Sequence, residues 1–114
     1  MTRLLLVLAL AACAKKTDDA GPAVKPIAAE EIQRGKDACK DYVDRVCACA
    51  AKVPEVKPQC DLARALPDAL RVQLEYAQAG ETSKNDVLAA QAAVRKVVKE
   101  CIEETAKLPS VGCQ

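Results

Sequence analysis

Six cysteines between residues 39 and 113 constrain the fold of this chain more than any other feature. The core around them has to be built from Leu, Val, Ile and Ala, because the chain contains no Phe and no Trp. Small exported domains with thin cores commonly depend on disulfides. We therefore predict three disulfides, and the absence of histidine weighs against the alternative, a thiolate metal site. The six residues are Cys39, Cys47, Cys49, Cys60, Cys101 and Cys113.

Residues 1–13 have the pattern of an export signal. Arg3 precedes an apolar run from Leu4 to Ala12, which is shorter than the roughly 20 residues that span a bilayer. The stretch Leu10-Ala11-Ala12-Cys13 resembles the lipobox of bacterial lipoproteins at every position. This resemblance implies that residues 1–12 are a signal peptide that is removed and that Cys13 is lipidated on sulfur. An ordinary secretory signal is the alternative.

The same resemblance implies a location. In the lipoprotein family, an aspartate after the lipidated cysteine favours retention in the inner membrane, and this chain has Ala14 there. We therefore expect a lipid-anchored protein of the cell envelope, held at the outer membrane and facing the periplasm or the cell surface. The membrane is then a partner through Cys13. Such compartments are oxidising, which agrees with a disulfide framework.

Residues 13–29 are predicted to be the lipidated cysteine and a flexible tether, because Gly21, Pro22 and Pro26 interrupt any helix there. The domain is expected to occupy residues 30–114. It shows three amphipathic segments with apolar side chains at steps of three and four, which predict helices over 30–53, 59–79 and 83–108. Pro67 falls within the second and predicts a break, Gly80 is expected to end it, and Ser83 is expected to cap the third.

An all-α fold follows, in which three helices joined by short loops form an up-down-up bundle stapled by disulfides. The first helix fixes where three cysteines point. Each helical residue turns by about 100°, so Cys47 and Cys49 lie about 80° to either side of Cys39 and face different neighbours.

The pairing is inferred from that geometry. If the end of the first helix, the start of the second and the chain end share one pole, Cys60 and Cys113 can each reach one of the two flanking cysteines. The exchanged pairing is the main alternative, and it requires the second helix to pack on the other side of the first. We predict Cys49–Cys60, Cys47–Cys113 and Cys39–Cys101.

Function classes are narrowed mostly by what the sequence lacks. Without Arg3, the chain has equal numbers of basic and acidic side chains, which argues against a nucleic-acid partner. The lack of histidine excludes Ser-His-Asp and Cys-His sites. Carboxylate pairs such as Glu103-Glu104 are adjacent in sequence and are typical of solvated helix surface. We expect no enzyme and no catalytic, cofactor-binding or metal-binding residues.

Two functions remain. The mature part resembles small cysteine-rich helical lipoproteins of unknown function. We predict a non-enzymatic envelope lipoprotein that acts as a protein-binding or structural adaptor module, with an envelope protein as its partner. The alternative is an envelope carrier of a small apolar ligand, a lipid or a metal. A concave apolar pocket with converging polar groups would favour the carrier, and a filled core with an exposed apolar patch would favour the adaptor.

Overall fold

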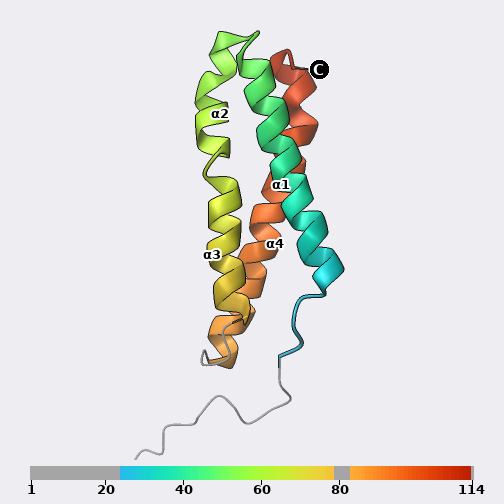
Figure 1. Ribbon diagram of the computed structural model, residues 1–114, viewed down its shortest axis with the longest axis vertical. Helices are drawn as coiled ribbons and strands as arrows, with labels where there is room; N and C mark the ends of the chain where they lie inside the picture. The colour runs from blue at the N-terminus through green and yellow to red at the C-terminus, as the bar shows by residue number, and fades with distance from the viewer. Residues whose placement is uncertain (1–23, 79–82, 114) are drawn as a thin grey trace, which may run out of the picture.

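A computed structural model describes residues 24–78 and 83–113, and within these residues the regular structure is entirely helical. The prediction of an all-α, disulfide-bonded domain is confirmed, with three main helical stretches (Figure 1). The predicted signal peptide, Cys13 and Gly80 lie outside the described residues. The elements are α1 (Ala29–Ala50), η1 (Pro54–Val56), α2 (Lys57–Ala63), α3 (Leu66–Gln78), α4 (Lys84–Lys107) and η2 (Leu108–Val111).

The first helix ends earlier than predicted. The expected range was 30–53, whereas α1 ends at Ala50, and Val53 has an extended backbone with φ −122° and ψ 91°. The residue before a proline is pushed out of the helical region by the proline ring. Pro54 therefore ends the helical stretch before the chain reaches it.

The second stretch is divided near Pro67, as predicted. The structure has α2 up to Ala63, a turn at Arg64 and Ala65, and then α3 from Leu66. Pro67 lies in the first turn of α3, where a missing N–H costs nothing because no residue of the helix would accept its bond. Before the break, residues 57–63 form a separate α-helix, α2.

Both ends of α4 follow local chemistry. The Ser83 hydroxyl oxygen accepts a hydrogen bond from the Asp86 backbone N–H at 3.2 Å, which is the expected cap. After η2, Gly112 adopts φ 89°, a left-handed conformation that glycine tolerates best. The Cys113 backbone N–H then donates to the Leu108 carbonyl at 2.9 Å. This turn directs Cys113 back toward the bundle.

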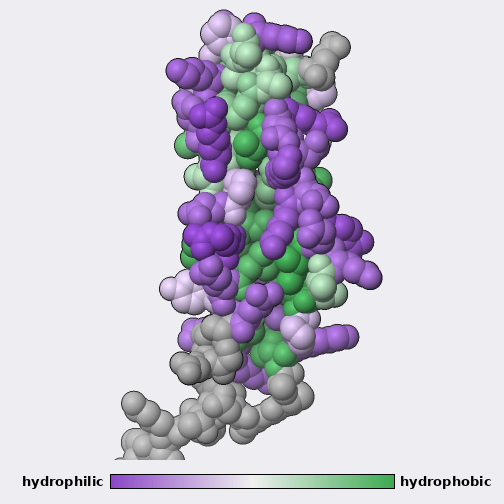
Figure 2. All heavy atoms as spheres, in the orientation of Figure 1, coloured by the Kyte–Doolittle hydropathy of each residue, from purple (hydrophilic) through white to green (hydrophobic). Residues whose placement is uncertain are grey.

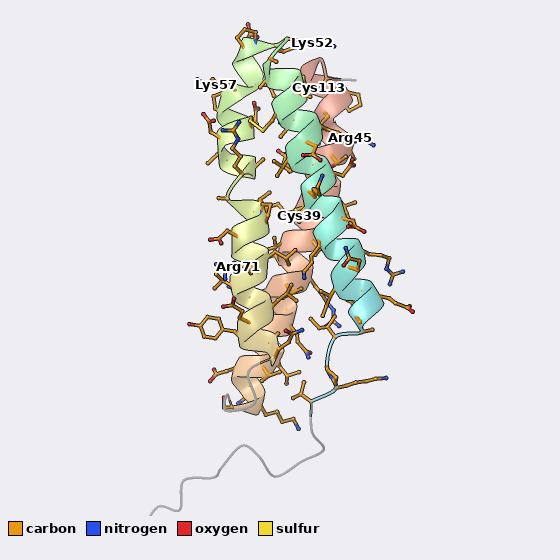
Figure 3. All side chains as sticks on the ribbon, viewed as in Figure 1. Cys39, Arg45, Lys52, Lys57, Arg71 and Cys113 are labelled. Atoms are coloured by element: carbon orange, nitrogen blue, oxygen red, sulfur yellow. A yellow bond between two sulfur atoms is a disulfide. The ribbon has the colours of Figure 1, made fainter. Side chains whose placement is uncertain are left out.

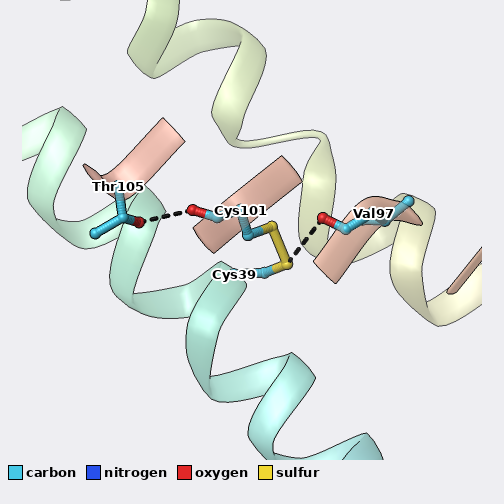
Figure 4. The surroundings of a disulfide bond; sticks show 4 residues. All are labelled: Cys39, Val97, Cys101 and Thr105. Carbon is cyan, nitrogen blue, oxygen red and sulfur yellow. Dashed lines mark hydrogen bonds between the residues drawn. A yellow bond between two sulfur atoms is a disulfide. The ribbon is translucent and has the colours of Figure 1, made fainter. Parts of the chain in front are cut away.

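The helices share one elongated core. α4 packs against both α1 and α3, and α1 packs against α2 (Figure 1). The largest side chains that are almost completely buried are Val46, Cys39 and Cys101. The Cys39–Cys101 bond lies between α1 and α4, and the Thr105 hydroxyl donates to the Cys101 carbonyl at 2.7 Å (Figure 4). The core therefore consists of disulfide sulfur and aliphatic side chains around Tyr42.

The three disulfides are Cys39–Cys101, Cys47–Cys60 and Cys49–Cys113. Their Cα–Cα distances of 4.9, 4.8 and 5.5 Å are ordinary for disulfides. The Cys39–Cys101 pair is the one that the sequence predicts. The predicted Cys49–Cys60 and Cys47–Cys113 pairs are wrong, because the structure exchanges their partners.

The exchange has a simple geometric cause. Cys47 and Cys49 flank the apolar stripe of α1 almost symmetrically, so helical periodicity gives them equivalent positions. In the structure α2 packs on the Cys47 side of α1, and the chain end after α4 reaches the Cys49 side. The predicted pairing requires α2 on the Cys49 side of α1 and the chain end on the Cys47 side, and each lies on the other side.

Candidate functional site

An apolar groove with a volume of about 400 Å³ lies between α1, α3 and α4. Figure 2 shows hydrophobic atoms gathered between α3 and the start of α1, bordered by hydrophilic side chains. Ile102 is 55% exposed within it, so the groove presents apolar surface to solvent. Its aliphatic lining residues are Ile27, Ile32, Leu70, Leu74, Val94, Val98 and Ile102.

Most of the residues that line the groove lie in a part of the molecule that no disulfide crosses, whereas Lys99, Ile102 and Glu103 lie on either side of Cys101. Cys113 lies at one end of the bundle and Cys39 near its middle (Figure 3). α3 contains no cysteine, and the bond nearest the groove is Cys39–Cys101. We call residues 24–38, α3 and residues 83–98 the disulfide-free half. Its parts are held together by side-chain packing, hydrogen bonds and ion pairs only, within the described residues.

Four charged side chains border the groove: Glu31, Arg95, Lys99 and Glu103. Arg95 Nε lies 2.9 Å from Glu31 Oε1 and joins α4 to α1, whereas Lys99 and Glu103 form a looser pair of 3.6 Å on α4. The hydrogen bond from Arg95 lowers the pKa of Glu31, and the same bond raises the pKa of Arg95. The rim therefore carries both signs of charge, already paired with each other.

The wall nearest the chain's N-terminal side comes from residues that the sequence analysis assigned to the tether. Ile27 is buried, with 9% of its surface exposed, and lines the groove. The Gln91 side-chain amide donates to the Lys25 backbone carbonyl at 2.9 Å. The packed structure thus includes residues before the predicted boundary at residue 30.

A local signal could have identified Ile27. Ala28 is the N-cap of α1, so Ile27 occupies the preceding position and Ile32 the fourth helical position. Apolar residues at these two positions commonly pack together as a hydrophobic staple. Both line the groove. Gln91 had no comparable signal, because its partner is a backbone carbonyl that is distant in sequence.

Other features of the described surface do not form a comparable site. A hollow of about 450 Å³ beside the Cys49–Cys113 bond is lined by charged side chains including Asp44, Arg45 and Lys52. The exposed apolar side chains Leu62, Tyr76 and Leu88 do not line the groove. Isolated exposed apolar residues are normal on soluble proteins. The groove is therefore the candidate site.

The groove is lined mainly by aliphatic side chains. Its interior consists of aliphatic groups, and no buried side-chain N or O atom among the described residues lacks a hydrogen-bond partner. The described residues also contain no group of three or more Cys, Asp or Glu side chains that could hold a metal ion. Within the same part of the chain, no helix is long and apolar enough to cross a membrane.

Comparison with known proteins gave no match to a protein-family model, to a curated protein or to a solved structure.

Proposed function

We propose that the chain is a non-enzymatic lipoprotein of the bacterial cell envelope that binds an apolar segment of another envelope protein in its groove. The observation that carries this proposal is the exposed aliphatic groove of about 400 Å³ between α1, α3 and α4. Apolar grooves between helices receive the apolar face of a partner segment, and their charged rims set its orientation. Glu31, Arg95, Lys99 and Glu103 are placed to serve as that rim.

The proposed architecture is an up-down-up bundle carried on a tether. Cys47–Cys60 supports an antiparallel pairing of α1 with α2, and Cys39–Cys101 together with Cys49–Cys113 supports a parallel pairing of α1 with α4. The tether starts at the proposed lipidated residue Cys13, and the packed domain begins near Lys25. Such an arrangement holds a rigid binding module close to the outer membrane.

A second candidate function is supported by the size of the groove. Pockets for small ligands usually measure about 300–1,000 Å³, and a groove of about 400 Å³ lies in this range. An envelope carrier of a small apolar ligand or a lipid chain would use the same aliphatic lining. Small-ligand sites bury most of the surface of the ligand, whereas this groove leaves Ile102 55% exposed. For this reason we place the adaptor function first.

The anchor is tested by replacing Cys13. The Cys13→Ala chain should lack the acyl mass that we expect intact-mass spectrometry to show on the native chain, and it should be left unprocessed or be released from the membrane. A Cys13→Ala chain with the same mature mass and the same membrane fraction as the native protein would refute the lipoprotein proposal.

The groove is tested by photo-crosslinking in living cells. A photoreactive amino acid at Ile102, which is 55% exposed in the groove, is compared with the same amino acid at Leu88, which is 47% exposed on α4 and outside the groove. The adaptor function predicts a protein adduct from position 102 and none from position 88. A lipid adduct from position 102 would instead support the carrier. Equal labelling from both positions would contradict the assignment of the groove as the binding site.

A further inference from the structure

We propose that residues 24–28 form a strap that closes one end of the groove, and that the strap can lift away from α4 while the helices stay folded. This inference rests on the groove being the binding site proposed above. It adds that binding in the groove is coupled to the position of the chain that leads to the N-terminus. Ile27 of the strap is buried and forms part of the groove wall.

The strap is attached by few contacts. Residues 24–28 have no regular secondary structure. Ile27 is buried against the groove, and the Lys25 carbonyl accepts the 2.9 Å hydrogen bond from Gln91. No disulfide includes these residues, since the first disulfide-bonded cysteine along the chain is Cys39. One apolar side chain and one neutral hydrogen bond therefore carry most of the attachment.

Gln91 is suited to a reversible contact. It is the only buried polar side chain among the described residues, with 5% of its surface exposed. Its amide binds a backbone carbonyl rather than a residue of the core. When the strap lifts, water can take the place of each partner, because both groups then face solvent. For this contact, opening therefore costs only the free energy of replacing one hydrogen bond within the protein by hydrogen bonds to water.

The junction with α1 allows the strap to move alone. Ala28 is the N-cap of α1 and provides no side-chain hydrogen bond. The α1 backbone begins its own hydrogen bonding with the Ile32 N–H donating to the Ala28 carbonyl at 3.1 Å. Rotation of the backbone before Ala28 leaves this bond intact. α1 also stays joined to α4 through Cys39–Cys101 and through the Glu31–Arg95 pair.

Opening exposes a longer apolar surface. Ile27 is buried in the apolar core and lines the groove together with Leu74 and Val94. When the strap lifts, the apolar surface against which Ile27 is buried becomes available to a ligand. A ligand that needs the open groove binds only the small fraction of molecules in which the strap is lifted. Its observed affinity equals its affinity for the open form multiplied by that fraction. Loosening the strap should therefore tighten binding, and a ligand that fills the groove should keep the strap lifted.

The experiment uses full-length Cys13→Ala protein in water, with 1-anilinonaphthalene-8-sulfonate as the apolar probe. Gln91→Met keeps the length of the side chain but cannot donate a hydrogen bond, and Leu88→Met is the matched control on the same helix outside the groove. Probe fluorescence gives the affinity, and the rate of limited proteolysis within residues 24–28 gives the population of molecules in which the strap is lifted. Ile102→Glu places a charge in the groove and should prevent the probe from binding there. The fluorescence that remains in this variant measures probe bound elsewhere on the protein.

Gln91→Met should bind the probe roughly five-fold more tightly, the effect of losing one net hydrogen bond. It should be cleaved faster within residues 24–28, while hydrogen exchange in residues 39–50 and the helical circular dichroism stay unchanged. Gln91→Glu, which replaces the donor by an acceptor, is a second variant with the same expected direction. Leu88→Met should match the parent in both measurements.

Two results would overturn the strap. Unchanged cleavage within residues 24–28 in both Gln91 variants would show that Gln91 does not hold the strap. Faster cleavage without tighter probe binding would show that the strap does not limit access to the groove. If Ile102→Glu leaves the probe signal unchanged in every variant, the probe does not bind in the groove, and the proposed function is refuted. This result differs from the two above, so failure of the strap and failure of the groove can be told apart.

Discussion

Gly35 of α1 faces Val98 of α4 at a distance that excludes a larger residue. A Cβ atom at Gly35 would lie 2.6 Å from Val98 Cγ2, which is shorter than real contacts of such atoms. Gly35 is buried at this crossing. The close approach, rather than an unusual backbone angle, is what requires glycine here. The contact lies in the disulfide-free half and helps to hold α1 against α4 beside the groove.

We predict that Gly35→Ala destabilises the protein despite improving helix propensity. Alanine gains about 1 kcal/mol over glycine in a helix, but overpacking costs about 1–3 kcal/mol, and the β-branched Val98 has little rotamer freedom in a helix. The expected net loss is about 1 kcal/mol in the free energy of unfolding measured with urea. Gly35→Ala/Val98→Ala should be more stable than the sum of the single changes indicates. Additive effects would contradict the contact.

The disulfide pairing can be read from single cysteine replacements. In Cys47→Ala the structure predicts that Cys60 is left as the free thiol, because Cys47 bonds Cys60. Alkylation without reduction, followed by mass spectrometry of peptides, identifies the modified residue. Cys49→Ala is the matched variant and should free Cys113. Alkylation at Cys113 in the Cys47→Ala protein would restore the pairing that the sequence analysis favoured.

The N-cap of α4 should contribute measurably to stability. Ser83→Ala removes the acceptor of the 3.2 Å hydrogen bond from the Asp86 N–H. Loss of such a cap costs about 1 kcal/mol, and we expect a lower thermal midpoint with faster hydrogen exchange at the start of α4. Ser83→Asp supplies another good capping oxygen and should retain most of the stability. Equal losses in both variants would indicate that the hydroxyl does not act as a cap.

The Glu31–Arg95 pair predicts a specific pH dependence. The hydrogen bond from Arg95, followed by the positive charges of Arg95 and Arg34, lowers the pKa of Glu31 below its ordinary value of 4.5. A lowered folded-state pKa means that the pair stabilises the fold above about pH 4.5, and that this contribution is lost as the pH falls further. Thermal midpoints of the native protein and of Glu31→Gln should therefore differ at neutral pH and converge in acid. A difference that persists unchanged at pH 2 would contradict this role, and added salt should weaken it.

Local chemistry in the sequence determined the helices and their ends. Apolar residues at steps of three and four gave the three helical stretches, Pro67 gave the break in the second, and Ser83 gave the start of the third. These features depend on residues within a few positions of each other, so a single sequence contains them. Cys39 points to the middle of the α1 stripe, and its bond with Cys101 required only that α1 and α4 be neighbours.

Tertiary structure alone decided the partners of Cys47 and Cys49 and the existence of the groove. The two cysteines are equivalent with respect to the α1 stripe, and the side on which α2 packs depends on the sum of many contacts between helices. The groove depends likewise on how far α1 and α3 stand apart over α4. Gln91 and Lys25 meet across 66 positions. Helical periodicity describes each helix about its own axis, and it contains no information about the side from which a distant segment approaches.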